Sequence, residues 1–263
     1  MLEYSFMQNA LMAGVLISIL CPSVGVFLVL KRYSMMGDAL SHSSFAGVAL
    51  GIITGINPIV SAFIFTSLCG LLIEKLRTYF RKHGDLILVI VMTLSIGIAI
   101  TLISSGKANA NVNSYLFGSI LTVTREDLVT VLILSFISVV TISLLYNQLV
   151  YITLDEDGAK IAGIKVKLIN YLFTLLVAAT ISVSLRIMGL LVISSMIAMP
   201  VAAAMQLNVG FKKTLVFSIS FGFIDIISGL ILSYYMNSAP GGTIAIASVA
   251  VLLAVILLKK LAK

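Results

Sequence analysis

The chain has 263 residues, of which 60% are hydrophobic and 10% are charged, and its formal net charge is +7. An ordinary soluble domain is about 25% charged, so this composition excludes a soluble globular protein and indicates a polytopic membrane protein. The basic residues stand at the ends of apolar runs and not on an aromatic-rich face, which makes them topology signals and argues against nucleic-acid binding.

Nine apolar runs follow one another from the N-terminus, each close to the roughly 20 residues that a spanning helix needs. We therefore expect an all-α membrane bundle of about 8–9 transmembrane helices, forming a single transmembrane domain over residues 1–263. Almost no polar residue separates the sixth and seventh runs, which meet at Arg186 and Ile187. The runs cover residues 8–30, 35–55, 57–74, 86–104, 128–146, 168–185, 187–207, 214–236 and 243–258.

The basic residues also predict the orientation. With the N-terminus outside, only Lys107, Arg125 and Arg186 of the 17 basic residues fall on the outer side. The positive-inside rule predicts this asymmetry, so we expect an outer N-terminus, a cytoplasmic C-terminus and a multi-pass place in the cell membrane. The basic residues expected inside are Lys31, Arg32, Lys75, Arg77, Arg81, Lys82, Lys160, Lys165, Lys167, Lys212, Lys213, Lys259, Lys260 and Lys263.

The second run carries the most informative polar residues, Asp38 and His42, within "GDALSHSSFAG". Residues four apart lie on one face of a helix, and a carboxylate beside an imidazole is a metal-ligand arrangement. Counting from Arg32 at about 1.5 Å per residue, His42 comes near mid-membrane, where an ionisable group costs about 2.5 kcal/mol or more. The alternative is structural: Asp38 caps a helix that starts after Gly37, and His42 is a hydrogen-bonded interior histidine.

Small residues in the same run indicate that this helix is buried among neighbours. They recur every four residues, at Ala39, Ser43, Gly47, Gly51 and Gly55.

The pair does not identify its metal. Zinc accepts imidazole and carboxylate in tetrahedral sites, while manganese and ferrous iron take similar ligands with more oxygen. A site that releases its ion should be incomplete, so water, Ser41, Met35 or a second subunit is expected to supply further ligands. The metal would then be transported and not held as a permanent cofactor.

Two segments are expected not to span. Residues 104–127 are polar at their start and too short at "YLFGSIL", which predicts a segment at the outer surface or one that dips into the bundle. Residues 147–167 form the longest polar inner connection and favour a short cytoplasmic helix. Its first turn is acidic, at Asp155, Glu156 and Asp157, as the helix dipole favours, and Gly163 permits termination.

Asp225 is a second carboxylate placed within an apolar run, and the same energetic reasoning predicts that it faces the bundle interior. It stays outside the predicted metal site, with a role in metal passage and a structural hydrogen bond both open. Pro22 and Pro200 interrupt two runs, where they either kink the helix or free carbonyl oxygens.

The chain resembles the permease subunits of bacterial ATP-binding-cassette importers for zinc, manganese and iron, and is most similar to the zinc permeases of Gram-positive bacteria. The resemblance runs nearly end to end. It rests on "RYSMMGDALSHSSFAGVALG" (32–51), "YLFGSILTVTREDL" (115–128), "DEDGAKIAGIKVKLINY" (155–171), "RIMGLLVISSMIAMPVAAAM" (186–205) and "APGGTI" (239–244).

The resemblance implies that Asp38 and His42 form the metal site of the translocation path. It also implies a coupling segment at about 150–165, with Asp155, Glu156, Ala159 and Gly163, that docks on a separate ATPase subunit. The expected partners are that ATPase, an extracellular metal-binding protein, a second copy of the chain and the lipid bilayer. Zinc is the first expected cargo, followed by manganese or iron.

The sequence contains no G-x-x-x-x-G-K-[ST] motif, so the chain lacks the loop that cradles nucleotide phosphates and is not expected to be an enzyme. Two other functions remain as alternatives. One is a proton-coupled secondary metal transporter that uses Asp38 or Asp225. The other is an importer of metal chelates, which would need a wide apolar cavity.

Overall fold

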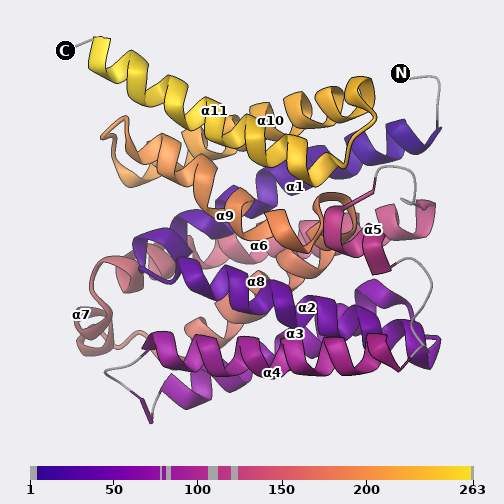
Figure 1. Ribbon diagram of the computed structural model, residues 1–263. Helices are drawn as coiled ribbons and strands as arrows, with labels where there is room; N and C mark the ends of the chain where they lie inside the picture. The colour runs from indigo at the N-terminus through magenta and orange to yellow at the C-terminus, as the bar shows by residue number, and fades with distance from the viewer. Residues whose placement is uncertain (1–4, 78, 81–83, 106–111, 120–123, 262–263) are drawn as a thin grey trace.

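The computed structural model describes residues 5–77, 79–80, 84–105, 112–119 and 124–261, and no strand occurs among them. Of the basic residues used to predict orientation, Arg81, Lys82, Lys107 and Lys263 lie outside this description. The helices, shown in Figure 1, are α1 (Ser5–Leu30), α2 (Ser34–Thr54), α3 (Pro58–Arg77), α4 (Gly84–Ser104), α5 (Val112–Phe117), α6 (Arg125–Leu154), α7 (Glu156–Ile161), α8 (Val166–Met188), α9 (Leu190–Met205), α10 (Phe211–Met236) and α11 (Pro240–Leu261).

The predicted all-α membrane bundle is confirmed. Seven described helices are long and apolar enough to span a membrane; α9 has only 16 residues, and α2 is less apolar because it carries Asp38, His42 and several serines. Figure 1 shows the long helices side by side, with α5 near the N-terminus at one end of the bundle and α7 at the other end, toward the C-terminus. We call these the α5 end and the α7 end; the prediction that the α7 end is cytoplasmic stays a prediction.

Two predicted boundaries differ from the structure. Helix α6 continues to Leu154, so residues 147–154 extend a long helix and are not part of a loop. The join between the sixth and seventh runs lies at Gly189, three residues after the predicted position. Gly189 has φ 77° and ψ 159°, a conformation that is essentially restricted to glycine, and this breaks the chain into α8 and α9.

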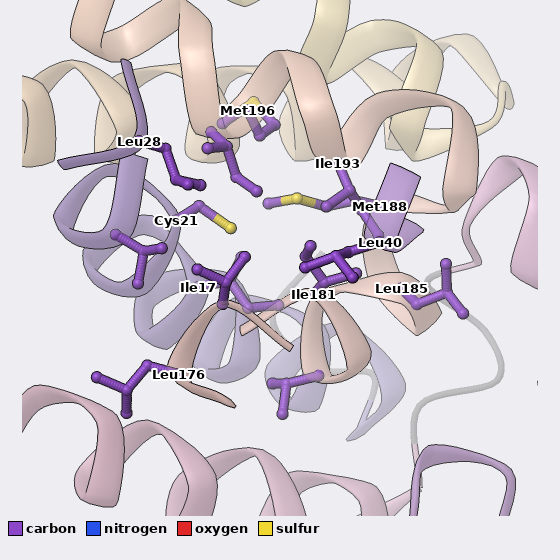
Figure 2. Packing of buried hydrophobic residues seen from close by; sticks show 14 of the residues in the cluster. Ile17, Cys21, Leu28, Leu40, Leu176, Ile181, Leu185, Met188, Ile193 and Met196 are labelled. Carbon is purple, nitrogen blue, oxygen red and sulfur yellow. The ribbon is translucent and has the colours of Figure 1, made fainter. Parts of the chain in front are cut away.

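The core lies where α1, α2, α8 and α9 meet. Figure 2 shows Ile17 and Cys21 of α1, Leu40 of α2, Ile181 of α8 and Ile193 of α9 around one junction, and all five side chains are fully buried. Because lipid tails are as apolar as these side chains, close packing and interhelical hydrogen bonds hold such a bundle together more than the hydrophobic effect does. The junction is therefore a rigid support for α2.

Candidate metal site

Helix α2 begins at Ser34, earlier than the structural alternative required. Its N-cap is Tyr33, and no side chain caps the helix. Asp38 is thus the fifth residue of α2, and the alternative in which it caps a helix starting after Gly37 is wrong. The side chains of Asp38 and His42 are both half-buried. Neither makes a hydrogen bond or an ion pair with any residue that the structure describes, so the predicted hydrogen-bonded histidine is also not observed.

Gly47 and Gly51, two of the small residues of α2, lie on the opposite side of the helix from the pair and contact α3. Gly47 follows Asp38 by nine residues, which is two and a half helical turns. A Cβ added at Gly47 would lie 2.7 Å from Cα of Ala62 and 2.9 Å from the carbonyl oxygen of Ser61. The Ser61 hydroxyl donates a hydrogen bond to the Gly47 carbonyl at 2.7 Å. The glycine face therefore fixes α2 against α3 and leaves the Asp38 and His42 face out of this contact.

Serines fix α2 to its other neighbours. The hydroxyls of Ser43 and Ser95 lie 2.8 Å apart, which joins α2 to α4. Ser44 donates to Ser182 of α8 at 3.5 Å. With α3, α4 and α8 on these faces, the rotation of α2 about its axis is set, and so is the direction in which Asp38 and His42 point.

The further ligands predicted from the same chain differ in position. Ser41 is fully buried, and its hydroxyl donates to the Gly37 carbonyl at 2.7 Å. Met35 is 57% exposed and precedes Asp38 by three residues, which places it near the same face. No group of three or more His, Cys, Asp or Glu side chains that could hold a metal ion occurs in the part of the chain that the structure describes. One copy thus offers two strong ligands.

A polar network lies at the α7 end, directly before α2. The sequence analysis used its basic residues only to predict the orientation of the chain. Lys31 donates to Asn170 of α8 at 3.0 Å, and its ammonium group lies 5.3 Å from the centre of the Phe173 ring. Burial lowers the pKa of Lys31 to about 8, against the opposing effects of the Glu74 and Glu156 carboxylates. The connection from α1 to α2 is thus held by α8.

The same network includes the end of α3. Arg77 pairs with Glu74 at 3.1 Å and lies 3.7 Å over the Tyr33 ring. Thr174 of α8 donates to Glu74 at 3.3 Å. The N-cap of α2 is therefore joined to α3 and α8, at the end of the bundle where α7 lies.

The predicted coupling segment forms helix α7. Asp155 is its N-cap and accepts a hydrogen bond from the Gly158 backbone N–H at 2.9 Å, while Glu156 pairs with Lys160 at 3.2 Å. Ala159 is fully buried, and Gly163 has φ 80° after the end of the helix. Ile161, which the sequence reasoning did not single out, is 89% exposed. The segment is a short exposed helix held by one buried face.

An ion pair at the α5 end was also missed. Asp127 is 3% exposed at its side chain, pairs with Arg186 of α8, and accepts from the Thr124 backbone N–H at 2.9 Å in a capping box. The Arg186 guanidinium group lies 5.9 Å from the centre of the Tyr115 ring of α5. The short helix α5, which the sequence predicted as a non-spanning segment, is therefore attached to α6 and α8.

Three glycines form a node of backbone contacts beside this ion pair. An added Cβ would lie 2.7 Å from the Met188 carbonyl carbon at Gly118, 2.5 Å from the Leu116 carbonyl oxygen at Gly189, and 2.8 Å from the Phe117 carbonyl oxygen at Gly241. We call Gly118, Gly189 and Gly241 the glycine node. It brings the exit of α5, the α8–α9 break and the start of α11 together without side chains between them.

Comparison with known proteins places the chain among membrane transport proteins. The profile of the ABC 3 transport family matches residues 3–259. The "Probable metal transport system membrane protein" of Treponema pallidum is 51% identical, covering 100% of this chain and 99% of that protein. The solved structure of PsaBC from Streptococcus pneumoniae in complex with Fab matches with a TM-score of 0.86 at 28% identity, over 96% of this chain and 91% of that chain.

More distant relatives have names that specify different metals. The high-affinity zinc uptake system membrane protein ZnuB of Buchnera aphidicola subsp. Baizongia pistaciae is 33% identical, over 90% of this chain and 92% of that protein. The manganese transport system membrane protein MntC of Listeria monocytogenes is 29% identical, over 94% of this chain and 88% of that protein.

Proposed function

The chain belongs to the ABC 3 transport family, and from this membership we propose that it imports zinc along the Asp38 and His42 face of α2, with manganese or iron as the next cargo. It is the membrane permease of an ATP-binding-cassette metal importer, and ATP hydrolysis lies in a separate subunit. The family membership favours ATP over a proton gradient as the energy source.

The observation that carries the proposal is the pair of half-buried polar side chains, Asp38 and His42, which make no hydrogen bond or ion pair within the described residues. Keeping an ionisable group at membrane depth is costly. A structural role would repay that cost through partners in the fold, and the described residues provide none. A divalent cation that sheds part of its water there would repay it through coordination.

Two ligands from one chain are too few for zinc, which is bound by four in most structural sites. We propose that two copies of the permease face each other across the transport path, so that two Asp38 and two His42 side chains surround one ion. This nitrogen and oxygen set suits zinc and is also acceptable to manganese and ferrous iron, in line with the mixed metals in the names of the relatives.

The partners are assigned to the two ends of the bundle. At the α7 end, the exposed Ile161, the N-cap Asp155 and Glu156 in the first turn of α7 are proposed to dock in a groove of the ATPase. Ala159 and Gly163 hold that helix in place. At the α5 end, helix α5 is proposed to receive the extracellular metal-binding protein. Closure of the ATPase then moves α7 and alternates access to the metal site.

The proposal is tested with the permease reconstituted with its ATPase and binding protein in proteoliposomes, with uptake of zinc, manganese and iron measured separately. Asp38→Asn and His42→Ala should each abolish uptake of the true cargo while the complex still assembles. Asp85→Asn, which changes an exposed carboxylate in the first turn of α4, should leave uptake unchanged. Normal uptake of every metal by both site variants would refute the assigned site.

The energy source is tested in the same vesicles. Uptake should require ATP. Continued uptake without ATP, driven by a proton gradient, would instead support the secondary transporter.

A further inference from the structure

Asp225 of α10 is a buried carboxyl group that the metal site does not use. Its side chain is 1% exposed, which confirms the predicted interior position. Neither of its carboxyl oxygens has a hydrogen-bond partner among the described residues. An ionised carboxylate in such a position would lose its hydration without any compensation, which is among the most costly arrangements in a protein.

The helices packed against α10 provide no counter-charge near Asp225. These helices are α1, α9 and α11. Helices α1 and α9 contain no charged residue, and Cys21 of α1 is their only titratable side chain. The charged residues of α11 are Lys259 and Lys260, in its last turn, and those of α10 itself besides Asp225 are Lys212 and Lys213, in its first turn. All four lysines are more than three helical turns away along the chain from the level of Asp225.

Two polar groups at the level of Asp225, the Ser248 hydroxyl and the Ser18 carbonyl, offer it no free donor. Gly229 of α10 lies against Ile244 of α11, and in this antiparallel pair the register brings Ser248 level with Asp225. The Ser248 hydroxyl donates to the Ala245 carbonyl at 2.9 Å, so its proton is used.

On the α1 side, the polar group near Asp225 is a hydrogen-bond acceptor. Pro22 has no N–H to donate to the Ser18 carbonyl one turn earlier. The Ser18 carbonyl oxygen lies 3.2 Å from the Cβ position of Gly222, one turn before Asp225. Side chains on a helix lean toward the preceding turn, so the Asp225 carboxyl group and this carbonyl lie at a similar level. A proton on Asp225 would supply the donor that this region lacks.

We propose that Asp225 is a proton-binding site that is occupied in this conformation and releases its proton when water enters the seam between α10 and α11 during transport. On release, the carboxyl O–H bond breaks, the proton passes to water, and a hydrated carboxylate remains. The occupied site follows from the packing alone. Its link to the transport cycle rests on the proposed function.

The occupied site is tested by infrared difference spectroscopy of the purified permease complex at neutral pH. The C=O stretching band of a protonated carboxyl group should be present in the wild type and lost in Asp225→Asn, which keeps the size and removes the acid. Asp85→Asn, at an exposed carboxylate, should retain the band. A wild-type spectrum without a protonated carboxyl band, or one that Asp225→Asn leaves unchanged, overturns the proposal.

A second measurement needs no variant and therefore does not depend on the folding of Asp225→Asn. Hydrophobic carbodiimides react with protonated carboxyl groups in apolar surroundings. Peptide mass spectrometry of the treated wild-type complex should find modified Asp225 and unmodified Asp85, and the reverse pattern would contradict the proposal.

The link to transport is tested by the pH dependence of ATP-driven metal uptake. The wild type should change its rate between mildly acidic and mildly alkaline pH, and Asp225→Asn should lose that part of the dependence. Identical pH profiles would remove the link. If the wild type transports no metal at any pH, the proposed function fails while the infrared result still decides whether Asp225 carries a proton.

Discussion

Replacement of Gly47 by alanine tests the packing that sets the direction of Asp38 and His42. The new Cβ would lie 2.7 Å from Cα of Ala62, whereas ordinary contacts begin at 3.4 Å, so α2 and α3 must separate by the difference, 0.7 Å. Overpacking of this kind costs about 1–3 kcal/mol. Alanine recovers about 0.5–1 kcal/mol through its better helix propensity. We expect a net loss of about 1–2 kcal/mol, close to tenfold in the unfolding equilibrium.

The matched control is Gly97→Ala in α4, where an added Cβ meets nothing within 4 Å. This variant should be as stable as the wild type or slightly more stable. Both cysteines are buried and free, so a thiol-reactive fluorophore reports unfolding of the purified protein as temperature rises. Equal melting temperatures for Gly47→Ala and Gly97→Ala would show that the contact between α2 and α3 does not determine stability as described.

Three further predictions concern the two ends of the bundle. Because the pKa of Lys31 falls from 10.5 to about 8 through burial, the unfolded chain binds more protons between these values, and stability should rise with pH over that window. Melting temperatures of the wild type and Lys31→Met at both ends of the window check this, and an equal rise in both would contradict it. Arg186→Met leaves Asp127 buried without its ion pair and should lower the free energy of unfolding by about 3–5 kcal/mol. The thiol assay measures this, and an unchanged melting temperature would show that the ion pair does not stabilise the fold. Gly163→Ala places a Cβ at φ 80°, which costs about 1–2 kcal/mol, and should lower ATP-driven uptake more than ATP hydrolysis, whereas Gly210→Ala, in open space, should change neither.

The fold was largely predictable because a spanning helix can be recognised from the length of its apolar run. Each of the nine predicted runs corresponds to a helix, and α4 at Gly84–Ser104 differs from the run 86–104 only at its start. The boundaries that failed depend on local geometry that composition does not reveal. The polar residues after 146 continue α6, since Asn, Gln and Tyr are tolerated on an exposed helical extension, and the break at Gly189 depends on a φ and ψ that only the packed node requires.

The candidate site was predictable in its residues and less so in its surroundings. Asp38 and His42 stand out by chemistry alone, and their metal-binding role stays a prediction. The sequence analysis grouped the small residues with this pair as evidence of burial. Gly47, however, points to the opposite side of α2 from Asp38 and faces α3. Asp127 and Arg186 meet across a long sequence separation, and no local pattern predicts such a partner.

The glycine node has a mechanical consequence. Since Gly118, Gly189 and Gly241 bring main chain against main chain, no flexible side chain is present to absorb a displacement between these segments. A tilt of α9 must carry the exit of α5 and the first turn of α11 with it as one block. The α5 end of the bundle would then move as a unit, and any larger residue at these three positions would force the contacting segments apart.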